Sequence, residues 1–443
     1  MPPRISRRWP HRAMHQGRAR HGWYWATAAA SMVALTAASA PAAAAGPAKS
    51  VTSTRPGPLS CGPPDYFIQC YRPGQYQVAY GVAPLLSRGN TGSGETVVMP
   101  ELANSPGPSF TDIRKDLAAF DKRFRLPTAK LKVTTTLAGA GTPYVAGTEE
   151  VEDTEIVHAL APGAALDVVL VPADATTGAA TFTAAVTGVI HAAITQSAAV
   201  VSISGSLGEH FFTPAEVARL HAALRQAADR HVTVVASSGD TGVISDDGPP
   251  VQVSLPASDP LVLGVGGTAL DASSATGAYL GEMAWNADNE ASAGGYSSLF
   301  RRPSYQDGAQ RTGRTRGVPD VAAAADAATA MALTFTGGVL YPAQGTSAAT
   351  PLWAAVIALA DQEAGHHLGF VNPAIYAIAR GAAYHDAFHD VITGDNSVFW
   401  PTRFFTGYTA GPGWDPVTGW GSPNAHVLVP LLAHAARHGG AGS

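Results

Sequence analysis

Two hydrophobic patterns alternate along the central part of the chain. Short runs rich in β-branched residues predict buried strands at 96–100, 166–171, 199–203, 232–236 and 261–265. Apolar residues spaced three and four apart predict helices over 112–123, 151–160, 181–197 and 214–230. Because strands and helices alternate, we expect one large α/β domain with a mostly parallel central sheet flanked by helices. Active residues of such a sheet gather near the carboxyl ends of its strands.

A Gly-rich, apolar stretch at 337–345 leads into a run with the spacing of a buried helix. Ser347 lies where this helix begins, and we place Pro351 in its first turn, where a missing N–H costs nothing. The positive end of a helix dipole favours developing negative charge, which suits a serine nucleophile. A Gly-Thr-Ser segment alone is more typical of an ordinary helix cap. Whether Ser347 is a nucleophile therefore depends on the other motifs.

The composition narrows the class of protein. The chain has 443 residues, 46% hydrophobic and 14% charged, so it can bury a large core. Its net charge of −5 and the lack of a basic block beyond the N-terminus argue against a nucleic-acid partner. Residues 1–45 combine arginines, an apolar stretch and small residues at a cleavage site, which is typical of a secretory signal. We therefore expect an exported protein.

The remaining boundaries follow from local composition. Residues 46–60 are rich in Pro, Gly, Ser and Thr and predict a linker or processed tail. The folded domain then covers 61–436, and 437–443 form a flexible tail. Cys61 and Cys70 are the two cysteines, and in an oxidising compartment we expect them to form a disulfide that closes a short loop.

Acidic residues crowd the start of the helix predicted near residue 151. Glu149 and Asp153 stand four residues apart, on the same face of a helix. Two adjacent carboxylates cannot both ionise freely, so one keeps a raised pKa and can relay a proton. An acid-rich first turn that complements the helix dipole gives the same pattern, so the pair alone does not establish a site.

Further aspartates follow strands and loops. Asp240 lies in a Ser-Gly-Asp-x-Gly segment after the strand at 232–236, where an ordinary turn is the simpler interpretation. Asp390 and Asp415 lie in separate loops, the second of them rich in glycine. Two carboxylates with open backbone carbonyls suit a hard cation such as Ca²⁺, although Asp-rich turns are common.

These motifs, and the order in which they occur along the chain, resemble the sedolisin family of serine-carboxyl peptidases, which has a subtilisin-like fold. The resemblance extends over about 61–432 and rests on Glu-x-x-x-Asp, Ser-Gly-Asp-x-Gly, Gly-Thr-Ser-x-x-x-Pro and the paired aspartates. It implies that Ser347 is the nucleophile, Glu149 the general base and Asp153 the partner of Glu149. It also implies that Asp240, when protonated, donates to the oxyanion, which requires an acidic working pH.

The same resemblance implies one bound Ca²⁺, with side-chain ligands Asp390 and Asp415 and carbonyl ligands Val391, Gly411 and Gly413. We expect a monomeric, secreted endopeptidase that acts on proteins or peptides and does not stay associated with membranes after signal removal. Sedolisins are usually made with a long propeptide, whereas only Gly46 to Ser60 lies between the predicted signal and the domain here.

This chain departs from the family pattern in places, and alternatives stay open. Glu152 stands where the family often has an apolar residue, and the tryptophan that many relatives carry near Gly205 is absent. The chain could be a catalytically silent peptide-binding relative, or a subtilisin-type peptidase with a histidine base. Against the second alternative, no histidine has the subtilisin sequence context. We expect the following histidines to be packed or solvated without a chemical role: His158, His191, His210, His221 and His231.

Overall fold

The computed structural model describes residues 59–62, 68–102, 112–135, 147–171, 178–245, 248–309, 313–335 and 338–439. The predicted signal, most of the linker and the end of the C-terminal tail lie outside the described residues. The described fold begins at Leu59 and its last helix ends at Gly439, so it extends slightly beyond the predicted limits of 61 and 436. Among the described helices, none combines the length and the apolar character that a membrane span requires.

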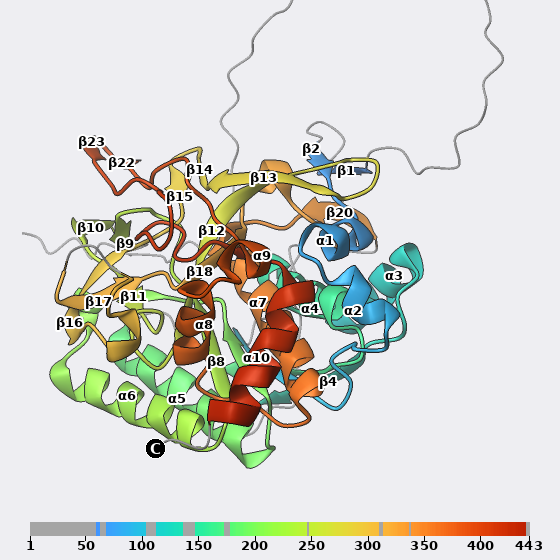
Figure 1. Cartoon of the computed structure of the whole chain (residues 1–443), viewed down its shortest axis with the longest axis horizontal. Helices are drawn as coiled ribbons and strands as arrows, with labels where there is room; N and C mark the ends of the chain where they lie inside the picture. The colour runs from blue at the N-terminus through green and yellow to red at the C-terminus, as the bar shows by residue number, and fades with distance from the viewer. Residues whose placement is uncertain are drawn as a thin grey trace, which may run out of the picture. The chain divides into compact units, whose positions relative to one another are not determined.

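The core of the fold is an eight-stranded sheet (Figure 1). Its strands are β3 (Thr96–Leu102), β4 (Lys130–Thr135), β5 (Ala165–Val171), β6 (Val200–Ile203), β8 (Thr233–Ser237), β12 (Leu263–Ala272), β13 (Tyr279–Ala284) and β18 (Val321–Ala324). The strand order is β13-β12-β8-β6-β3-β5-β4, and β18 pairs with β12 outside this path. The pairing of β12 with β13 is antiparallel and the others are parallel. The predicted mostly parallel sheet is therefore confirmed.

Helices cover both faces of this sheet. The α-helices are α1 (Pro73–Ala79), α2 (Ala83–Ser87), α3 (Ile113–Phe124), α4 (Thr148–Leu160), α5 (Ala179–Thr195), α6 (Pro214–Asp229), α7 (Gly345–Ala364), α8 (Asn372–Ala379), α9 (Tyr384–Ala387) and α10 (Ala425–Gly439). Short 3₁₀ helices are η1 (Glu209–Phe211), η2 (Ser304–Gln306) and η3 (Ala327–Thr329). Helices α5 and α6 cover one face, and α4 and α7 cover the other, with α3 packed on α4 and α10 on α7 (Figure 1).

Short antiparallel pairs surround the main sheet. They are β1 (Leu59–Cys61) with β2 (Ile68–Cys70), β7 (Leu207–Gly208) with β11 (Ser254–Leu255), β9 (Ile244–Ser245) with β10 (Gly248–Val251), β14 (Asn286–Ala287) with β15 (Glu290–Ala291), β16 (Gly295–Arg301) with β17 (Thr315–Val318), β19 (Ala332–Phe335) with β20 (Val339–Pro342), β21 (Phe388–His389) with β24 (Ser422–Pro423), and β22 (Val398–Trp400) with β23 (Arg403–Phe405).

The order of the strands creates a switch point between β3 and β6. The chain leaves β3 through α3 toward β4 at one edge of the sheet, whereas it leaves β6 through α6 toward β8 on the other side. Parallel α/β sheets bind ligands at the carboxyl ends of strands where such connections diverge. Glu101 lies at the end of β3 and Ser204 directly follows β6. The fold therefore marks this place as a candidate site.

Helix α7 is buried from Gly345 to Asp361 because its residues are small or apolar on all sides. Pro351 lies inside the helix, so its predicted position in the first turn was wrong. A proline lacks the N–H that would bond the carbonyl four residues earlier, which belongs to Ser347. The carbonyl oxygen of Ser347 instead lies 3.4 Å from the hydroxyl of Ser204.

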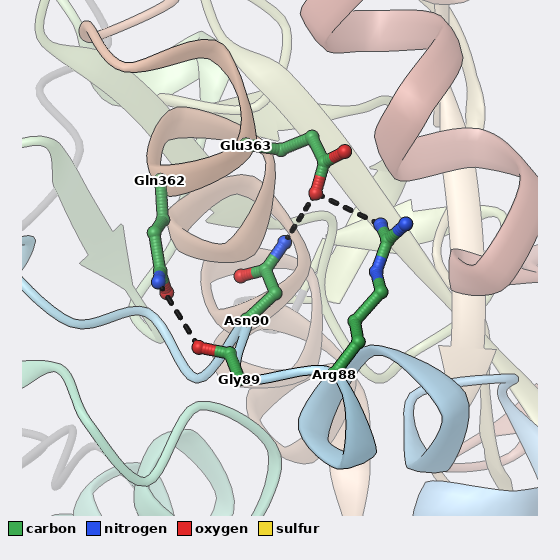
Figure 2. A pocket seen from close by; sticks show the side chains of 5 residues that line it. All are labelled: Arg88, Gly89, Asn90, Gln362 and Glu363. Carbon is green, nitrogen blue, oxygen red and sulfur yellow. Dashed lines mark hydrogen bonds and ion pairs between the residues drawn. The ribbon is translucent and has the colours of Figure 1, made fainter.

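A polar pocket of about 360 Å³ lies at the other end of α7 (Figure 2). It is lined by Arg88, Gly89, Asn90, Gln362 and Glu363. The Glu363 carboxylate accepts hydrogen bonds from Arg88 at 2.8 Å and from Asn90 at 3.0 Å, which ties the segment after α2 to the helix. With a rise of 1.5 Å per residue, Gln362 is about 22 Å along the helix from Ser347. This pocket is therefore separate from the start of α7.

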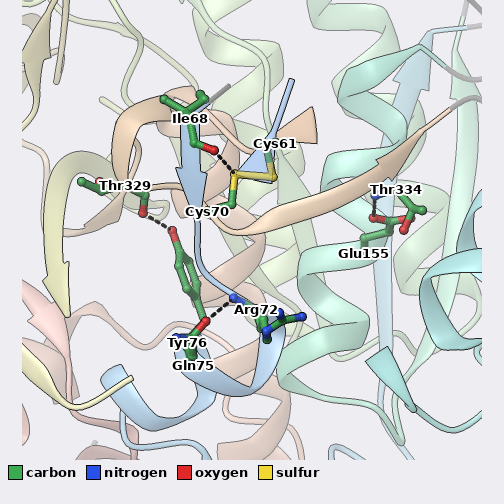
Figure 3. The surroundings of a disulfide bond; sticks show 9 residues. All are labelled: Cys61, Ile68, Cys70, Arg72, Gln75, Tyr76, Glu155, Thr329 and Thr334. Carbon is green, nitrogen blue, oxygen red and sulfur yellow. Dashed lines mark hydrogen bonds between the residues drawn. A yellow bond between two sulfur atoms is a disulfide. The ribbon is translucent and has the colours of Figure 1, made fainter. Parts of the chain in front are cut away.

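Cys61 and Cys70 form the predicted disulfide between β1 and β2, with their Cα atoms 5.9 Å apart (Figure 3). Both are buried and pack with Ala332 and Leu340 of the β19–β20 pair. The N–H of Gly62 also donates to the Leu340 carbonyl at 2.8 Å. The disulfide thus links β1 to β2, and this pair packs against the hairpin that leads into α7.

Replacing both cysteines by serine is expected to lower the free energy of unfolding by about 2–3 kcal/mol. The disulfide spans a sequence separation of 9, and a loop of this size restricts the unfolded chain by roughly that amount. Urea unfolding of the double variant measures the loss, and wild-type protein treated with a reductant should lose the same amount. An unchanged midpoint would show that the cross-link does not restrain the unfolded chain.

Candidate active site

Three elements bring the predicted catalytic residues together on one side of the sheet. Glu149 and Asp153 lie on α4, Asp240 lies in the loop after β8, and Ser347 is the third residue of α7. Helix α4 packs along α7, and the hydrogen bonds described below connect the β8 loop to the start of α7. The structure therefore assembles residues that are almost 200 positions apart in the sequence.

The Ser347 hydroxyl has two acceptors within reach. It donates a hydrogen bond to the carbonyl oxygen of Ser204 at 3.2 Å, and the Glu149 carboxylate lies close enough to this hydroxyl that their interaction lowers the pKa of Glu149. A hydroxyl has one proton, so it can donate to one of these acceptors at a time. Among the described residues, no histidine forms a hydrogen bond with Ser347. The carboxylate of Glu149 is thus the side-chain base in contact with this serine.

The Asp240 carboxyl lies against the first turn of α7. Its Oδ1 atom accepts hydrogen bonds from the Thr346 N–H at 2.8 Å and from the Thr346 hydroxyl at 2.7 Å. Gly345 has a φ of +80°, and a Cβ at this position would lie 2.7 Å from Oδ2 of Asp240. A side chain at residue 345 would therefore push the carboxyl away. Because residue 345 is glycine, the Asp240 carboxyl can lie directly against it, two positions before Ser347.

Buried carboxyl groups form a cluster around Asp153. Burial, together with the negative charges of neighbouring carboxylates, raises the pKa values of Glu101, Glu149 and Glu152 well above the usual range. Asp153 itself is fully buried, and burial raises its pKa to about 7, although hydrogen bonds from Ser204 and Glu101 act in the opposite direction. Groups that interact this strongly lose their protons as a set.

Glu152, which departs from the family pattern, has a different contact from Glu149. Its Oε2 atom accepts a hydrogen bond from the backbone N–H of Gln344 at 3.1 Å, directly before α7. Glu149, in contrast, contacts the hydroxyl of Ser347. The geometry therefore favours Glu149 as the base over a pairing shifted to Glu152.

Sequence reasoning did not single out Glu101 or Ser204 as site residues. The Ser204 hydroxyl lies 2.8 Å from Oδ1 and 3.0 Å from Oδ2 of Asp153, and Glu101 forms a side-chain hydrogen bond with Asp153. Both residues stand at the carboxyl ends of strands that the sequence predicts correctly. Their position at strand ends was therefore a signal that could have identified them.

The predicted calcium ligands also come together. Asp390 accepts a hydrogen bond from the Gly413 N–H at 3.1 Å, and Asp415 accepts one from the Gly411 N–H at 3.0 Å. The Val391 carbonyl accepts a bond from the hydroxyl of Thr418, which also contacts Asp415. The two carboxylates thus hold the same Gly-rich loop. Within the described part of the chain, no cluster of three or more His, Cys, Asp or Glu side chains could hold a metal.

This second site has one property that suits a hard cation, namely two carboxylates without a basic partner among the described residues. Asp415 is buried, and burial raises its pKa to about 6. Among the described residues, neither Asp390 nor Asp415 forms an ion pair with a basic side chain. A divalent cation would offset this buried negative charge, and with only two carboxylates it would also need backbone carbonyl oxygens.

Comparison with known proteins places the chain in a family. A model of the subtilase family matches residues 134–420. The chain belongs to the subtilase family. Kumamolisin from Bacillus sp. (strain MN-32) is 38% identical to this subtilase over 302 residues, which are 65% of this chain and 51% of kumamolisin. Sedolisin from Pseudomonas sp. (strain 101) is 36% identical over 208 residues, which are 44% of this chain and 34% of sedolisin.

A solved structure supports the same assignment. Pseudomonas sedolisin, a serine-carboxyl proteinase in complex with two molecules of pseudo-iodotyrostatin, aligns with a TM-score of 0.70 and 26% identity, covering 84% of this chain and 99% of sedolisin. The predicted sedolisin resemblance and subtilisin-like fold are therefore confirmed. The names of these relatives also support the predicted class of serine-type peptidase. This subtilase spans about half or less of the length of the curated relatives it matches.

The raised pKa values predict that the fold loses stability as the pH rises. The pKa of Asp153 rises from 3.8 to about 7 on folding, so the folded state binds this proton more tightly. The stabilisation is complete below about pH 4 and is lost as the pH rises through about 7. We expect the Tm of a Ser347→Ala variant, chosen because Ser347 is the predicted nucleophile, to fall over that interval in differential scanning calorimetry.

A second substitution in the same background isolates one buried acid. Glu152→Gln removes a titrating group and keeps an oxygen that can accept the Gln344 N–H, so we expect a shallower fall in Tm with pH. Asp229→Asn is the control, because Asp229 is an exposed acid at the end of α6. An equally steep fall in the Glu152 variant would contradict the role of this buried carboxyl.

Proposed function

We propose that this chain is a serine-carboxyl endopeptidase that hydrolyses peptide bonds of proteins or peptides at acidic pH. The observation that carries the proposal is the contact between the Ser347 hydroxyl and the Glu149 carboxylate beside Asp240. A serine needs a base to become a nucleophile, and it needs a donor near the carbonyl oxygen of the substrate. The resemblance to kumamolisin and sedolisin supports the same assignment of roles.

In the proposed reaction, the Ser347 oxygen attacks the carbonyl carbon of the scissile bond while its proton passes to Glu149. Asp153 orients Glu149 and stabilises the proton that Glu149 has accepted. Asp240 donates a hydrogen bond to the oxyanion. When the carbon–nitrogen bond breaks, Glu149 returns the proton to the leaving amine, and water then hydrolyses the acyl-enzyme through the same base.

The pH dependence follows from these protonation states. Activity requires that Glu149 can accept a proton, so the acid limb of the profile reports the titration of the Glu149–Asp153 pair. It also requires a proton on Asp240, so activity is lost when this carboxyl ionises as the pH rises. Because both requirements must be met, we expect a bell-shaped profile whose maximum lies between the titration of the pair and that of Asp240.

Substitutions of the base and the nucleophile test this proposal. We expect Ser347→Ala to lower kcat/KM by about 10⁴-fold or more and Glu149→Gln by about 10³-fold, because each removes a group that acts in the transition state. The measurement is the rate of peptide hydrolysis from about pH 3 to about pH 9. Glu216→Gln provides a variant with an unchanged site.

Each result has a definite meaning for the proposal. Serine-dependent activity that is confined to acid supports the carboxyl mechanism. A maximum at neutral or alkaline pH would instead require a histidine base. Turnover that survives in Ser347→Ala would show that the nucleophile is wrongly assigned, and a wild-type chain without turnover would favour a peptide-binding relative.

We also propose that one Ca²⁺ binds at Asp390 and Asp415, with the carbonyls of Val391, Gly411 and Gly413 as further ligands. The buried charge of Asp415 and the convergence of both carboxylates on one loop support this proposal. When bound, the ion would connect the two loops to each other. Its role would be structural.

Calcium is expected to raise the thermal stability of the protein. At a free Ca²⁺ concentration 100 times the Kd, binding adds about 2.7 kcal/mol to the stability of the folded state, so the Tm should rise on addition and fall with a chelator. Asp415→Asn should abolish this response. Asp386→Asn, which changes an exposed aspartate four positions before Asp390, should keep this response. A response that persists in Asp415→Asn would place the ion elsewhere.

We propose in addition that the protein is exported and acts as a monomer. The signal-like segment 1–45 supports export, and this segment lies outside the described residues.

A further inference from the structure

Ser204 contacts both Asp153 of α4 and the first turn of α7, which carries Ser347. Its hydroxyl is 2.8 Å from Oδ1 and 3.0 Å from Oδ2 of Asp153, and 3.4 Å from the Ser347 carbonyl oxygen. The hydroxyl carries one proton, and the Asp153 carboxylate is both the nearer and the stronger acceptor. Ser204 is 8% exposed and Asp153 is fully buried, so water competes little for this bond.

The other groups that face Asp153 are acids. Glu101 approaches from the end of β3, and Glu149, Glu150 and Glu152 approach from its own helix. Asp240, from the loop after β8, interacts with Glu149 and Glu152 in the same cluster. Glu101 can donate to Asp153 only while it is protonated. Of the described groups that hydrogen-bond to Asp153, Ser204 is the donor whose proton does not titrate in the working range.

The position of Ser204 is set by the main sheet. Strand β6 is buried along its whole length and pairs with β3 and β8, so the residue that follows it has little freedom. The carbonyl of Ser204 faces the Ser347 hydroxyl at 3.2 Å. Pro351 leaves the Ser347 carbonyl without its usual helical donor, which lets the Ser204 residue approach the first turn of α7.

We infer that Ser204 is a positioning residue of the proposed reaction, whose hydroxyl favours the ionised form of Asp153 and orients this carboxyl toward Glu149. The inference rests on the proposed function. An ionised Asp153 stabilises the proton that Glu149 takes from Ser347, in the way that a buried aspartate supports the base of other serine peptidases. Ser204 touches none of the reacting atoms through its hydroxyl and acts through Asp153.

The test is the pH profile of kcat/KM for Ser204→Ala. Without the donor, Asp153 holds its proton to a higher pH, so we expect the acid limb to move up by about one pH unit and the maximal kcat/KM to fall about tenfold. The alkaline limb, which belongs to Asp240, should stay in place. A general loosening of the site would lower activity without moving the acid limb.

Further variants provide a graded comparison. Ser204→Thr keeps the hydroxyl and should restore the acid limb, whereas Ser204→Cys offers a weaker donor and should give an intermediate shift. If Ser204→Ala does not fold, the cysteine variant serves for the test. Ser202→Ala is the matched control, because Ser202 is a fully buried serine of β6, the strand directly before Ser204, and its hydroxyl has no hydrogen-bond partner among the described residues. It should leave the acid limb unchanged.

A measurement that does not need turnover separates this inference from the proposed function. In the Ser347→Ala background, the Tm difference caused by Ser204→Ala should grow as the pH rises through about 7, because the hydroxyl binds the ionised form of Asp153 more strongly. A pH-independent difference, or an acid limb that stays in place in an active Ser204→Ala enzyme, overturns the role of Ser204. Loss of Ser347 dependence would instead overturn the proposed function.

Discussion

The structure depends on the burial of several carboxyl groups beside the first turn of α7. Among the described residues, no Lys, Arg or His forms an ion pair with Glu101, Glu149, Glu152 or Asp153. Full ionisation of this cluster would place like charges in a poorly hydrated space, which costs several kcal/mol per ion. The cluster therefore retains protons, and hydrogen-bond donors decide which oxygen atoms carry the remaining charge.

Helix α7 places Ser347 beside this cluster of carboxyl groups. Its interior is built from small and apolar side chains, so it can lie against the sheet along most of its length while its first turn reaches the carboxyl ends of the strands. Gly345 admits the Asp240 carboxyl, and Pro351 frees the carbonyl of Ser347 from the helical hydrogen-bond pattern. Thr346 holds Asp240 through its N–H and its hydroxyl. These residues thus allow two polar groups, the Asp240 carboxyl and the Ser347 carbonyl, to lie at the first turn of a buried helix.

Much of this arrangement could be predicted from the sequence because the apolar periodicity is strong. The strands at 96–100 and 199–203 and the helix that begins near Ser347 were predicted from local patterns, and the structure confirms them. The position of Pro351 was wrong because the helix begins two residues before Ser347, and the tertiary contacts that tolerate an internal proline are not visible in the sequence. Glu101 and Ser204 were missed because each is an ordinary residue in its own segment. Their importance comes from the strand order, which brings β3 and β6 together.

Burial couples the chemistry of this site to the stability of the fold. The environment that raises the pKa of Glu149 makes it a stronger base, and the same environment makes ionisation of the cluster unfavourable for the folded state. A rise in pH therefore removes the proposed oxyanion donor and destabilises the surrounding helices at the same time. These two effects differ in reversibility, since a carboxyl regains its proton at once when acid is restored, whereas an unfolded peptidase is open to digestion by its neighbours. A loss of activity that reverses immediately on acidification belongs to the titration of the site, and the part that does not reverse belongs to the fold.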